Sequence, residues 1–136
     1  MKSRWALLGL MMAGSAGAQF ATLPISGPTY IFFDWGKSEL STDATAILDS
    51  VAEHYRAAPG PMLIDGHSDR SGPAGPNVAS SRKRAEIARD YLAAHGIPGS
   101  AMRVRAYGEA APIIATEDGV REVQNRRVEI RFVAAN

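Results

Sequence analysis

The sequence contains no cysteine, and its 136 residues include only three histidines and two tryptophans. The absence of cysteine excludes disulfide bonds, thiolate nucleophiles and cysteine-based zinc sites. The sequence also lacks an excess of either charge, since 15 basic residues stand against 14 acidic ones. This balance argues against nucleic acid as a partner, because nucleic-acid binding needs a strongly basic face. The length suits a single domain with an ordinary hydrophobic core.

Long hydrophobic runs are also missing, apart from one near the N-terminus at residues 5–14. This run is too short to span a bilayer comfortably. A short basic region precedes it, and the small residues 16–18 follow it in the A-x-A form of a cleavage site. The order is typical of a signal peptide at residues 1–18, with Gln19 as the first mature residue. The alternatives are an uncleaved anchor and a buried N-terminal helix.

Removal of the expected signal peptide changes the character of the chain. Residues 1–18 hold two basic residues and no acidic one, so the mature chain carries one more acidic than basic residue. No cysteine stands at the cleavage point to receive a lipid. Residues 19–28 read as a linker with two prolines, and residues 29–136 as the folded domain. We therefore expect the mature chain in the periplasm or at the outer membrane, with no transmembrane segment of its own.

Hydrophobic periodicity predicts an α+β fold with two layers and the element order β-α-β-α-β-β. The expected strands span residues 30–35, 62–65, 102–107 and 126–133, and the expected helices run from Ser41 or Thr42 to Pro59 and from Asn77 to His95. In the last strand apolar residues alternate with charged ones. This alternation predicts a sheet with helices on one face and water on the other. A long loop is expected at residues 108–120.

Charged side chains follow the first two expected strands. Asp34 lies at the end of the first strand, and Asp69 follows the second. Because parallel strands place their carboxyl ends at one edge of a sheet, we expect the two carboxylates on the same side of the molecule. If the last strand runs antiparallel, Arg126 begins it on that side as well. The N-terminus of the second helix adds free N–H groups there, which favours an anion or a zwitterion as ligand.

Arg84 lies about two turns into the second helix. Helical side chains lean toward the N-terminus, so its guanidinium can reach back toward the loop that carries Asp69. Arg84 would then hold a carboxylate and Asp69 an ammonium, at opposite ends of one zwitterion. Asn77 would cap the helix and orient the loop at once.

Each of these residues also has a purely structural interpretation, which the sequence leaves open. In that interpretation Asp69 is a helix cap and binds no ligand, and Arg84 is solvated or forms a weak surface pair. Asp34 can brace a turn. Arg126 can be one more exposed arginine of a strand.

Two readings as an enzyme or metal site fail on the residues present. The run Gly66-His67-Ser68-Asp69-Arg70 comes near the G-x-S-x-G nucleophile elbow, but arginine replaces its second glycine. His67 and Asp69 could share a metal, but the other two histidines lack ligand spacing. We expect a binding protein without enzymatic activity, metal or cofactor.

The central stretch resembles the signature of the OmpA-like C-terminal domain, G-H-T/S-D-x-x-G followed by N-x-x-L-S-x-x-R-A. The matching residues are Gly66-His67-Ser68-Asp69-Arg70-Ser71-Gly72, Asn77 and Ser81-Arg82-Lys83-Arg84-Ala85. Further matches are Phe33-Asp34, Tyr107-Gly108-Glu109 and Asn125-Arg126-Arg127-Val128-Glu129-Ile130. The resemblance covers about residues 29 to 133. The family includes the peptidoglycan-associated lipoproteins and the periplasmic part of flagellar stators.

This resemblance implies a mixed four-stranded sheet of order 1-4-2-3 with an antiparallel fourth strand. It also implies non-covalent binding of peptidoglycan through the diaminopimelate of the stem peptide, in support of cell-envelope integrity. The residues that it assigns to this grip are Asp69, Arg84, Asn77, Asp34 and Arg126. The alternative function is a periplasmic adaptor that binds another envelope protein and contacts the wall only weakly.

The sequence departs from the family pattern at three positions. Ser80 stands where leucine is usual, Pro76 replaces a common aromatic residue, and Gly36 stands where some members carry a second aspartate. None of these changes removes the pair of Asp69 and Arg84. Most members of the family also carry an anchor, whereas this sequence shows only a cleavable signal, so we expect a free wall-binding domain.

Overall fold

The computed structural model describes residues 27–133, so the expected signal peptide and most of the expected linker lie outside the described residues. The elements follow in the order β1 (Thr29–Phe32), α2 (Thr42–Ala57), β2 (Met62–Gly66), α3 (Ala74–Ala94), the 3-10 turn η1 (Gly99–Ala101), β3 (Met102–Ala106), the 3-10 turn η2 (Val123–Asn125) and β4 (Arg127–Phe132). This order confirms the prediction. In this part of the chain no helix is both long and apolar enough to cross a membrane.

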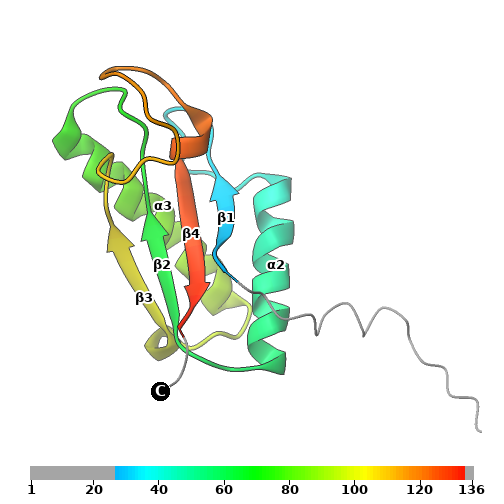
Figure 1. Ribbon diagram of the computed structural model, residues 1–136. Helices are drawn as coiled ribbons and strands as arrows, with labels where there is room; N and C mark the ends of the chain where they lie inside the picture. Colours follow the sequence, from blue (N-terminus) through cyan, green and yellow to red (C-terminus); the bar gives the residue numbers. More distant parts are fainter. Residues whose placement is uncertain (1–26, 134–136) are drawn as a thin grey trace, which may run out of the picture.

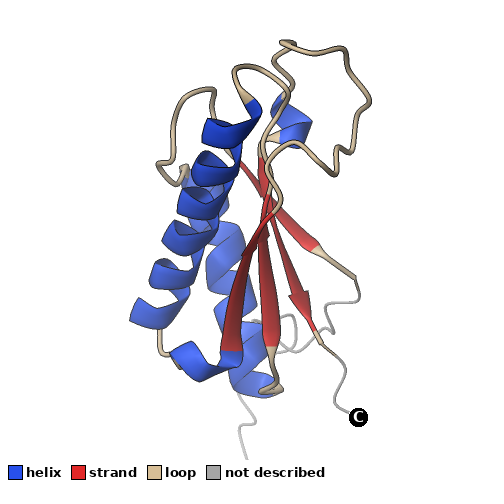
Figure 2. Ribbon diagram, turned by 90° about the vertical axis from the view of Figure 1, so that its left-hand side faces the viewer, coloured by secondary structure: helices blue, strands red, loops and turns tan. Residues whose placement is uncertain are grey.

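The four strands form one mixed sheet in the order β1-β4-β2-β3. Strands β2 and β3 are parallel, and β4 lies between β1 and β2, antiparallel to both. Figure 1 shows β4 at the centre of the sheet, between β1 and β2. Helices α2 and α3 cover the same face, which leaves the other face without a helix (Figure 2). The predicted fold class, strand order and antiparallel last strand are therefore confirmed.

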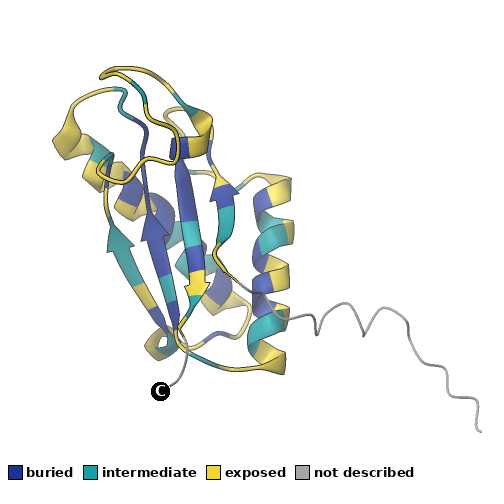
Figure 3. Ribbon diagram, viewed as in Figure 1, coloured by how far each residue is buried: buried dark blue, intermediate teal, exposed yellow. Residues whose placement is uncertain are grey.

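The core lies between the sheet and the two helices. The alternation predicted for the last strand holds on the helix side, where Val128 and Ile130 are buried. The expected wet face is only partly so, because Arg131 is exposed but Arg127 is buried. The partners of Val128 and Ile130 in the core come from every layer and include Ile31, Phe33, Leu48, Val51, Ile64, Ala85, Ala88 and Leu92. Figure 3 shows the same pattern, with β2 and β4 dark and most of the loop before η2 exposed.

Two predicted boundaries were wrong. Helix α3 begins at Ala74, with Pro73 at the N-cap, rather than at Asn77. Pro76 fits this first turn because the N–H group that proline lacks would have no partner inside the helix. Strand β1 ends at Phe32 rather than at residue 35, because the chain turns there: the N–H group of Lys37 donates to the carbonyl of Asp34.

Strand β2 and helix α3 approach most closely at Gly66. A Cβ atom at this position would lie 1.9 Å from the backbone oxygen of Ser81. We therefore expect Gly66→Ala to force the helix away from the sheet and to lower the free energy of unfolding by about 1–3 kcal/mol, measured by urea denaturation. Gly60→Ala is the control, because a Cβ atom there meets nothing within 4 Å. Equal stability of the two variants would contradict this packing.

Candidate functional site

The loops at one end of the sheet surround a small cavity of about 160 Å³. These are the loops at the upper end of β2 and β4 in Figure 1. The lining residues come from the segment after β1, the loop after β2, helix α3 and the residue before β4: Trp35, Gly36, Ser68, Asp69, Ser71, Gly72, Asn77, Ser80, Arg84 and Arg126. A pocket that encloses a drug-sized molecule usually has at least about 300 Å³. This cavity therefore suits the end of a longer molecule.

Four of the five predicted site residues line this cavity, namely Asp69, Asn77, Arg84 and Arg126. They come from segments far apart in the sequence, which the shared sheet edge brings together as predicted. Asp34 does not line it. Its side chain is exposed and lines a larger neighbouring groove between β1 and α2.

The carboxylate of Asp69 is almost fully buried, with an exposed fraction of 2%. Its Oδ1 accepts hydrogen bonds from the backbone N–H of Ser71 at 3.1 Å and from the hydroxyl of Ser71 at 2.5 Å. Its Oδ2 accepts from Nη1 of Arg126 at 2.6 Å and from the N–H of Glu122 at 3.1 Å. Burial alone would raise the pKa of Asp69, but the bonds from Ser71 and Arg126 bring this pKa below its ordinary value. Asp69 therefore stays ionised and does not cap helix α3.

Arg126 connects the site to the first strand. Its exposed fraction is only 8%, so it is not one more exposed arginine of a strand. Besides the ion pair with Asp69, its Nε donates to the carbonyl of Phe33 at 3.0 Å. The sequence analysis gave Asp69 and Arg84 as the charges that face the ligand. In the structure the direct partner of Asp69 is Arg126.

The guanidinium of Arg84 is buried without a carboxylate partner. Its exposed fraction is 5%, and its Nε donates to the carbonyl of Lys37 at 3.0 Å. The group also lies over the ring of Phe33, 5.4 Å from its centre. Among the described residues, nothing accepts a hydrogen bond from either terminal nitrogen of Arg84. Burial, and next the charge of Arg126, lower the pKa of Arg84, which leaves a desolvated cation on the wall of the cavity.

Asn77 orients the loop that carries Asp69. Its Nδ2 donates to the carbonyls of Ser71 at 3.0 Å and of Asp69 at 3.3 Å. The predicted N-cap role is wrong, because Asn77 lies inside the first turn of α3, and no side chain caps this helix. The two hydrogen bonds agree with the other expected role of Asn77, which is to orient the loop.

Six residues of the cavity wall were not among the predicted site residues, and they include three whose side chains carry polar groups: Trp35, Ser68 and Ser71. The hydroxyl of Ser68 is buried and has no hydrogen-bond partner among the described residues. Nε1 of Trp35 donates to the hydroxyl of Ser71 at 3.1 Å, and the guanidinium of Arg121 lies 3.4 Å from the centre of the Trp35 ring. Ser68 and Ser71 stood inside the recognised motif, so their position was a usable signal. Trp35 was assigned to the strand instead.

Two departures from the family pattern, Gly36 and Ser80, lie on the cavity wall. Together with Arg84 they also line a second hollow of about 140 Å³, which Lys37 and Lys83 border. Both hollows therefore share Arg84, and the second hollow adds the two cations Lys37 and Lys83. The surface around Arg84 is positively charged and favours an anionic group.

The long loop before η2 supports the site from outside the cavity. Arg70 holds it, since Nη1 of Arg70 donates to the carbonyl of Thr116 and the N–H of Gly119 donates to the carbonyl of Arg70, both at 2.8 Å. At the end of the loop, the N–H of Glu122 reaches Asp69. No residue between 108 and 122 lines the cavity. The loop therefore fixes Asp69 in place.

His67 faces away from the cavity, onto the side of the sheet that has no helix. Its ring stacks on Tyr107 with 5.2 Å between the centres, and neither ring nitrogen has a hydrogen-bond partner among the described residues. Burial, and next the charge of Arg127, lower the pKa of His67, so the ring is neutral at pH 7. Within residues 27–133 no three acidic or histidine side chains lie close enough to hold a metal ion.

Comparisons with known proteins agree with this architecture. The OmpA family model matches residues 32–126. The peptidoglycan-associated lipoprotein of Rhizobium meliloti is 38% identical over 98 residues, which cover 71% of this chain and 56% of that protein. An outer membrane protein of Gluconacetobacter diazotrophicus is 35% identical over 117 residues, which cover 79% of this chain and 30% of that protein. This chain therefore matches only part of the length of either relative.

A solved structure gives the same result. The crystal structure of the peptidoglycan-associated lipoprotein from Burkholderia pseudomallei superposes with a TM-score of 0.71 and 27% identity. The superposition covers 76% of this chain and 89% of that one. Residues 32–126, which the OmpA family model matches, include the loop of Asp69, the whole of helix α3 and Arg126 just before β4. The chain belongs to the OmpA family.

Proposed function

We propose that this protein binds peptidoglycan without covalent chemistry, in the bacterial cell envelope. The ligand is the free zwitterionic end of diaminopimelate in the stem peptide. Membership of the OmpA family supports this proposal, as do relatives named for their association with peptidoglycan. The observation that carries it is the buried guanidinium of Arg84, whose terminal nitrogens have no partner among the described residues.

Arg84 is the group that binds the ligand carboxylate. A buried charge without a counter-ion is costly for a fold, so a site that retains one is suited to an anionic ligand. The guanidinium presents a planar pair of donors that matches a carboxylate. The unpartnered hydroxyl of Ser68 on the same wall supplies one more donor or acceptor. Because Asp69 and Arg126 neutralise each other, the cavity keeps one net positive charge for the carboxylate.

Asp69 serves the ammonium end of the ligand in a second step. All four of its acceptor positions are used within the protein. The bond from the Ser71 hydroxyl is the one that can open, since the Ser71 side chain can turn about its Cα–Cβ bond, whereas the other three donors are fixed by the backbone or by Arg126. This turn moves the hydroxyl oxygen away from Oδ1 and frees Oδ1 for an ammonium group. Asn77 and the loop at residues 113–122 keep the carboxylate in place during this exchange.

The size of the cavity agrees with this ligand. At about 160 Å³ it takes one amino-acid end and leaves the rest of the stem peptide outside.

The site also contains a hydroxyl next to Asp69 in sequence, that of Ser68. No base accepts a hydrogen bond from this hydroxyl among the described residues. We therefore propose that the site grips the wall, rather than that Ser68 acts as a nucleophile.

The test is sedimentation of the purified protein with sacculi in about 0.15 M salt, where long-range charge attraction is screened. We expect the protein to sediment with the sacculi and free meso-diaminopimelate to release it. Nα-acetyl-L-lysine amide is the matched competitor, because its α-groups are blocked as in a peptide, so it keeps the side-chain ammonium and has no free carboxylate. Release by this lysine derivative at the same concentration, or no sedimentation at all, would show that the proposed grip is wrong.

A further inference from the structure

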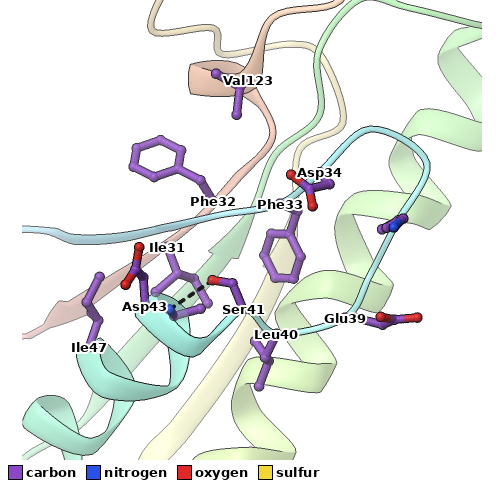
Figure 4. Close-up of a pocket in the computed structure, with 12 residues that line it drawn as sticks. Ile31, Phe32, Phe33, Asp34, Glu39, Leu40, Ser41, Asp43, Ile47 and Val123 are labelled. Atoms are coloured by element: carbon purple, nitrogen blue, oxygen red, sulfur yellow. Dashed lines mark hydrogen bonds between the residues drawn. The ribbon is translucent and has the colours of Figure 1, made fainter.

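A second concave site lies along the outer edge of β1, beside the N-terminus of α2. It is a groove of about 380 Å³. Its apolar lining includes Ile31, Phe32, Phe33, Leu40 and Val123. Figure 4 shows Phe33 on the side of Ser41 and Leu40, and Phe32 on the opposite side, toward Val123. The groove therefore runs around the edge of β1 and touches both faces of the sheet.

Within residues 27–133 the backbone of β1 is open along this edge. Here β1 is an edge strand of the sheet, and β4 is its one paired neighbour. The N–H group of Phe33 donates to the carbonyl of Arg126 at 3.0 Å, which continues the antiparallel ladder. Hydrogen-bonding directions alternate along such a strand, so the N–H and C=O groups of Tyr30 and Phe32 point away from β4. An extended chain can add to this edge by pairing with these groups.

The charges around the groove define its partner. Three carboxylates, those of Asp34, Glu39 and Asp43, stand against the single ammonium of Lys37. In the described part of the chain none of these three carboxylates has a side-chain hydrogen bond or an ion pair. The floor between them is apolar, and Phe32 on the outer side is 41% exposed. A lysine or arginine side chain matches this combination, because its stem covers apolar surface while its charge reaches the rim.

We infer that this groove is a docking site for an extended, basic segment of another protein, which adds as a strand to the free edge of β1. The backbone of Tyr30 and Phe32 supplies the pairing groups. The carboxylates of Asp34, Glu39 and Asp43 select basic side chains in the segment. This groove adjoins the cavity at Arg84 but shares none of its lining residues, so one molecule can hold the cell wall and a protein partner together.

The probe is a fluorescein-labelled peptide of eight residues in which lysine and valine alternate, and binding is followed by fluorescence anisotropy. Two control peptides differ by one property each: glutamate replaces lysine in the first, and every backbone nitrogen is methylated in the second. We expect the lysine peptide to bind and both controls to bind at least about tenfold more weakly, since each lacks the charge or the strand pairing. Equal binding of either control would overturn the inference.

Variants of the protein test the same two contributions, the charge attraction and the strand pairing. Glu39→Gln combined with Asp43→Asn should weaken the lysine peptide about tenfold and leave sedimentation with sacculi unchanged. Phe32→Pro should weaken the peptide more than Phe32→Ala does, because only proline removes the outward N–H group, and an edge strand tolerates proline where that group faces solvent. Thermal melting checks that each variant is folded. Unchanged peptide binding in the folded variants, or a dimer in sedimentation velocity that buries this edge, would overturn the inference.

Discussion

Replacing Arg84 with methionine should reduce binding of the protein to sacculi by well over tenfold and leave the fold intact. Methionine keeps much of the apolar length of arginine but carries no charge and no donors. Losing one partner of a buried, hydrogen-bonded charge pair typically costs about 2–5 kcal/mol of binding. The affinity, measured by sedimentation over a range of sacculus concentrations, should fall accordingly.

The fold should tolerate this change because the Arg84 charge gains less from nearby Asp69 than it loses through burial and the charge of Arg126. Burial and the charge of Arg126 lower its pKa, which means that folding disfavours the charged form. The variant loses the bond from Nε to the carbonyl of Lys37, a loss of about 1 kcal/mol, and relieves the repulsion from Arg126. We expect the free energy of unfolding to change by no more than about 1 kcal/mol. Substitution of a residue that serves the fold alone would lower the free energy of unfolding and leave wall binding by the folded protein unchanged.

Arg82→Met is the matched control for this experiment. Arg82 lies on the same helix and is exposed, so the substitution changes the net charge of the protein equally. Wall binding should stay close to that of the unaltered protein. If both variants lose affinity equally, the attraction is a general effect of net charge, and the assignment of Arg84 to the ligand carboxylate is refuted.

Breaking the buried pair of Asp69 and Arg126 should instead destabilise the whole domain. Asp69→Asn leaves the Arg126 guanidinium buried and unpaired, and Arg126→Met leaves the carboxylate with only its three remaining donors. Removing one member of a buried pair typically costs about 3–5 kcal/mol. We expect each single variant to lose about that much free energy of unfolding in urea denaturation. The double variant should lose less than the sum of the two, because the residues interact directly.

An exposed pair provides the comparison. Nε and Nη2 of Arg89 donate to Asp90 at 3.1 and 3.0 Å, with side-chain exposed fractions of 37% and 69% for the two residues. Arg89→Met should therefore cost at most about 1 kcal/mol. A similar loss for the buried and the exposed pair would mean that burial of Asp69 and Arg126 has no energetic consequence.

The stabilisation of the fold by the Asp69 carboxylate depends on pH, because it requires the ionised form of Asp69. The bonds from Ser71 and Arg126 outweigh burial and place this pKa below its ordinary value of 3.8. The stabilisation is therefore complete above that value and is lost as the pH falls through the lower, folded-state pKa. The difference in stability between the unaltered protein and Asp69→Asn should shrink below about pH 4, in the same urea measurements.

Much of the fold was accessible from local patterns. The alternation of Val128, Ile130 and Phe132 with charged residues predicted that one face of the last strand lies toward the helices. The burial of Val128 and Ile130 confirms this prediction. The start of α3 could not be predicted from the sequence. Asparagine is a common N-cap residue, so Asn77 was taken as the N-cap and Pro76 as the residue before the helix. In the structure proline occupies the first turn, and Asn77 uses its side chain on the loop of Asp69.

The candidate site was predictable as a group of residues, but the way its charges pair was not. Asp34 and Asp69 were expected together because both follow strands that end at the same edge. The turn of the chain after Phe33 instead carries Asp34 to the groove beside α2. The partner of Asp69 lies 57 residues away in sequence, and no local pattern distinguishes Arg126 from Arg84 in that role.

The sequence by itself determined the order of the elements, the common edge at which the charged residues meet, and the family. These properties depend on periodicity, on glycine and proline at element ends and on a contiguous motif, all of which are local. Only the tertiary structure decided that Arg126 satisfies Asp69 while Arg84 remains a buried cation without a carboxylate partner among the described residues. It also decided that, in the described part of the chain, β1 is an edge strand beside an acidic groove. Pairing and burial depend on distances between segments that only the folded chain brings together.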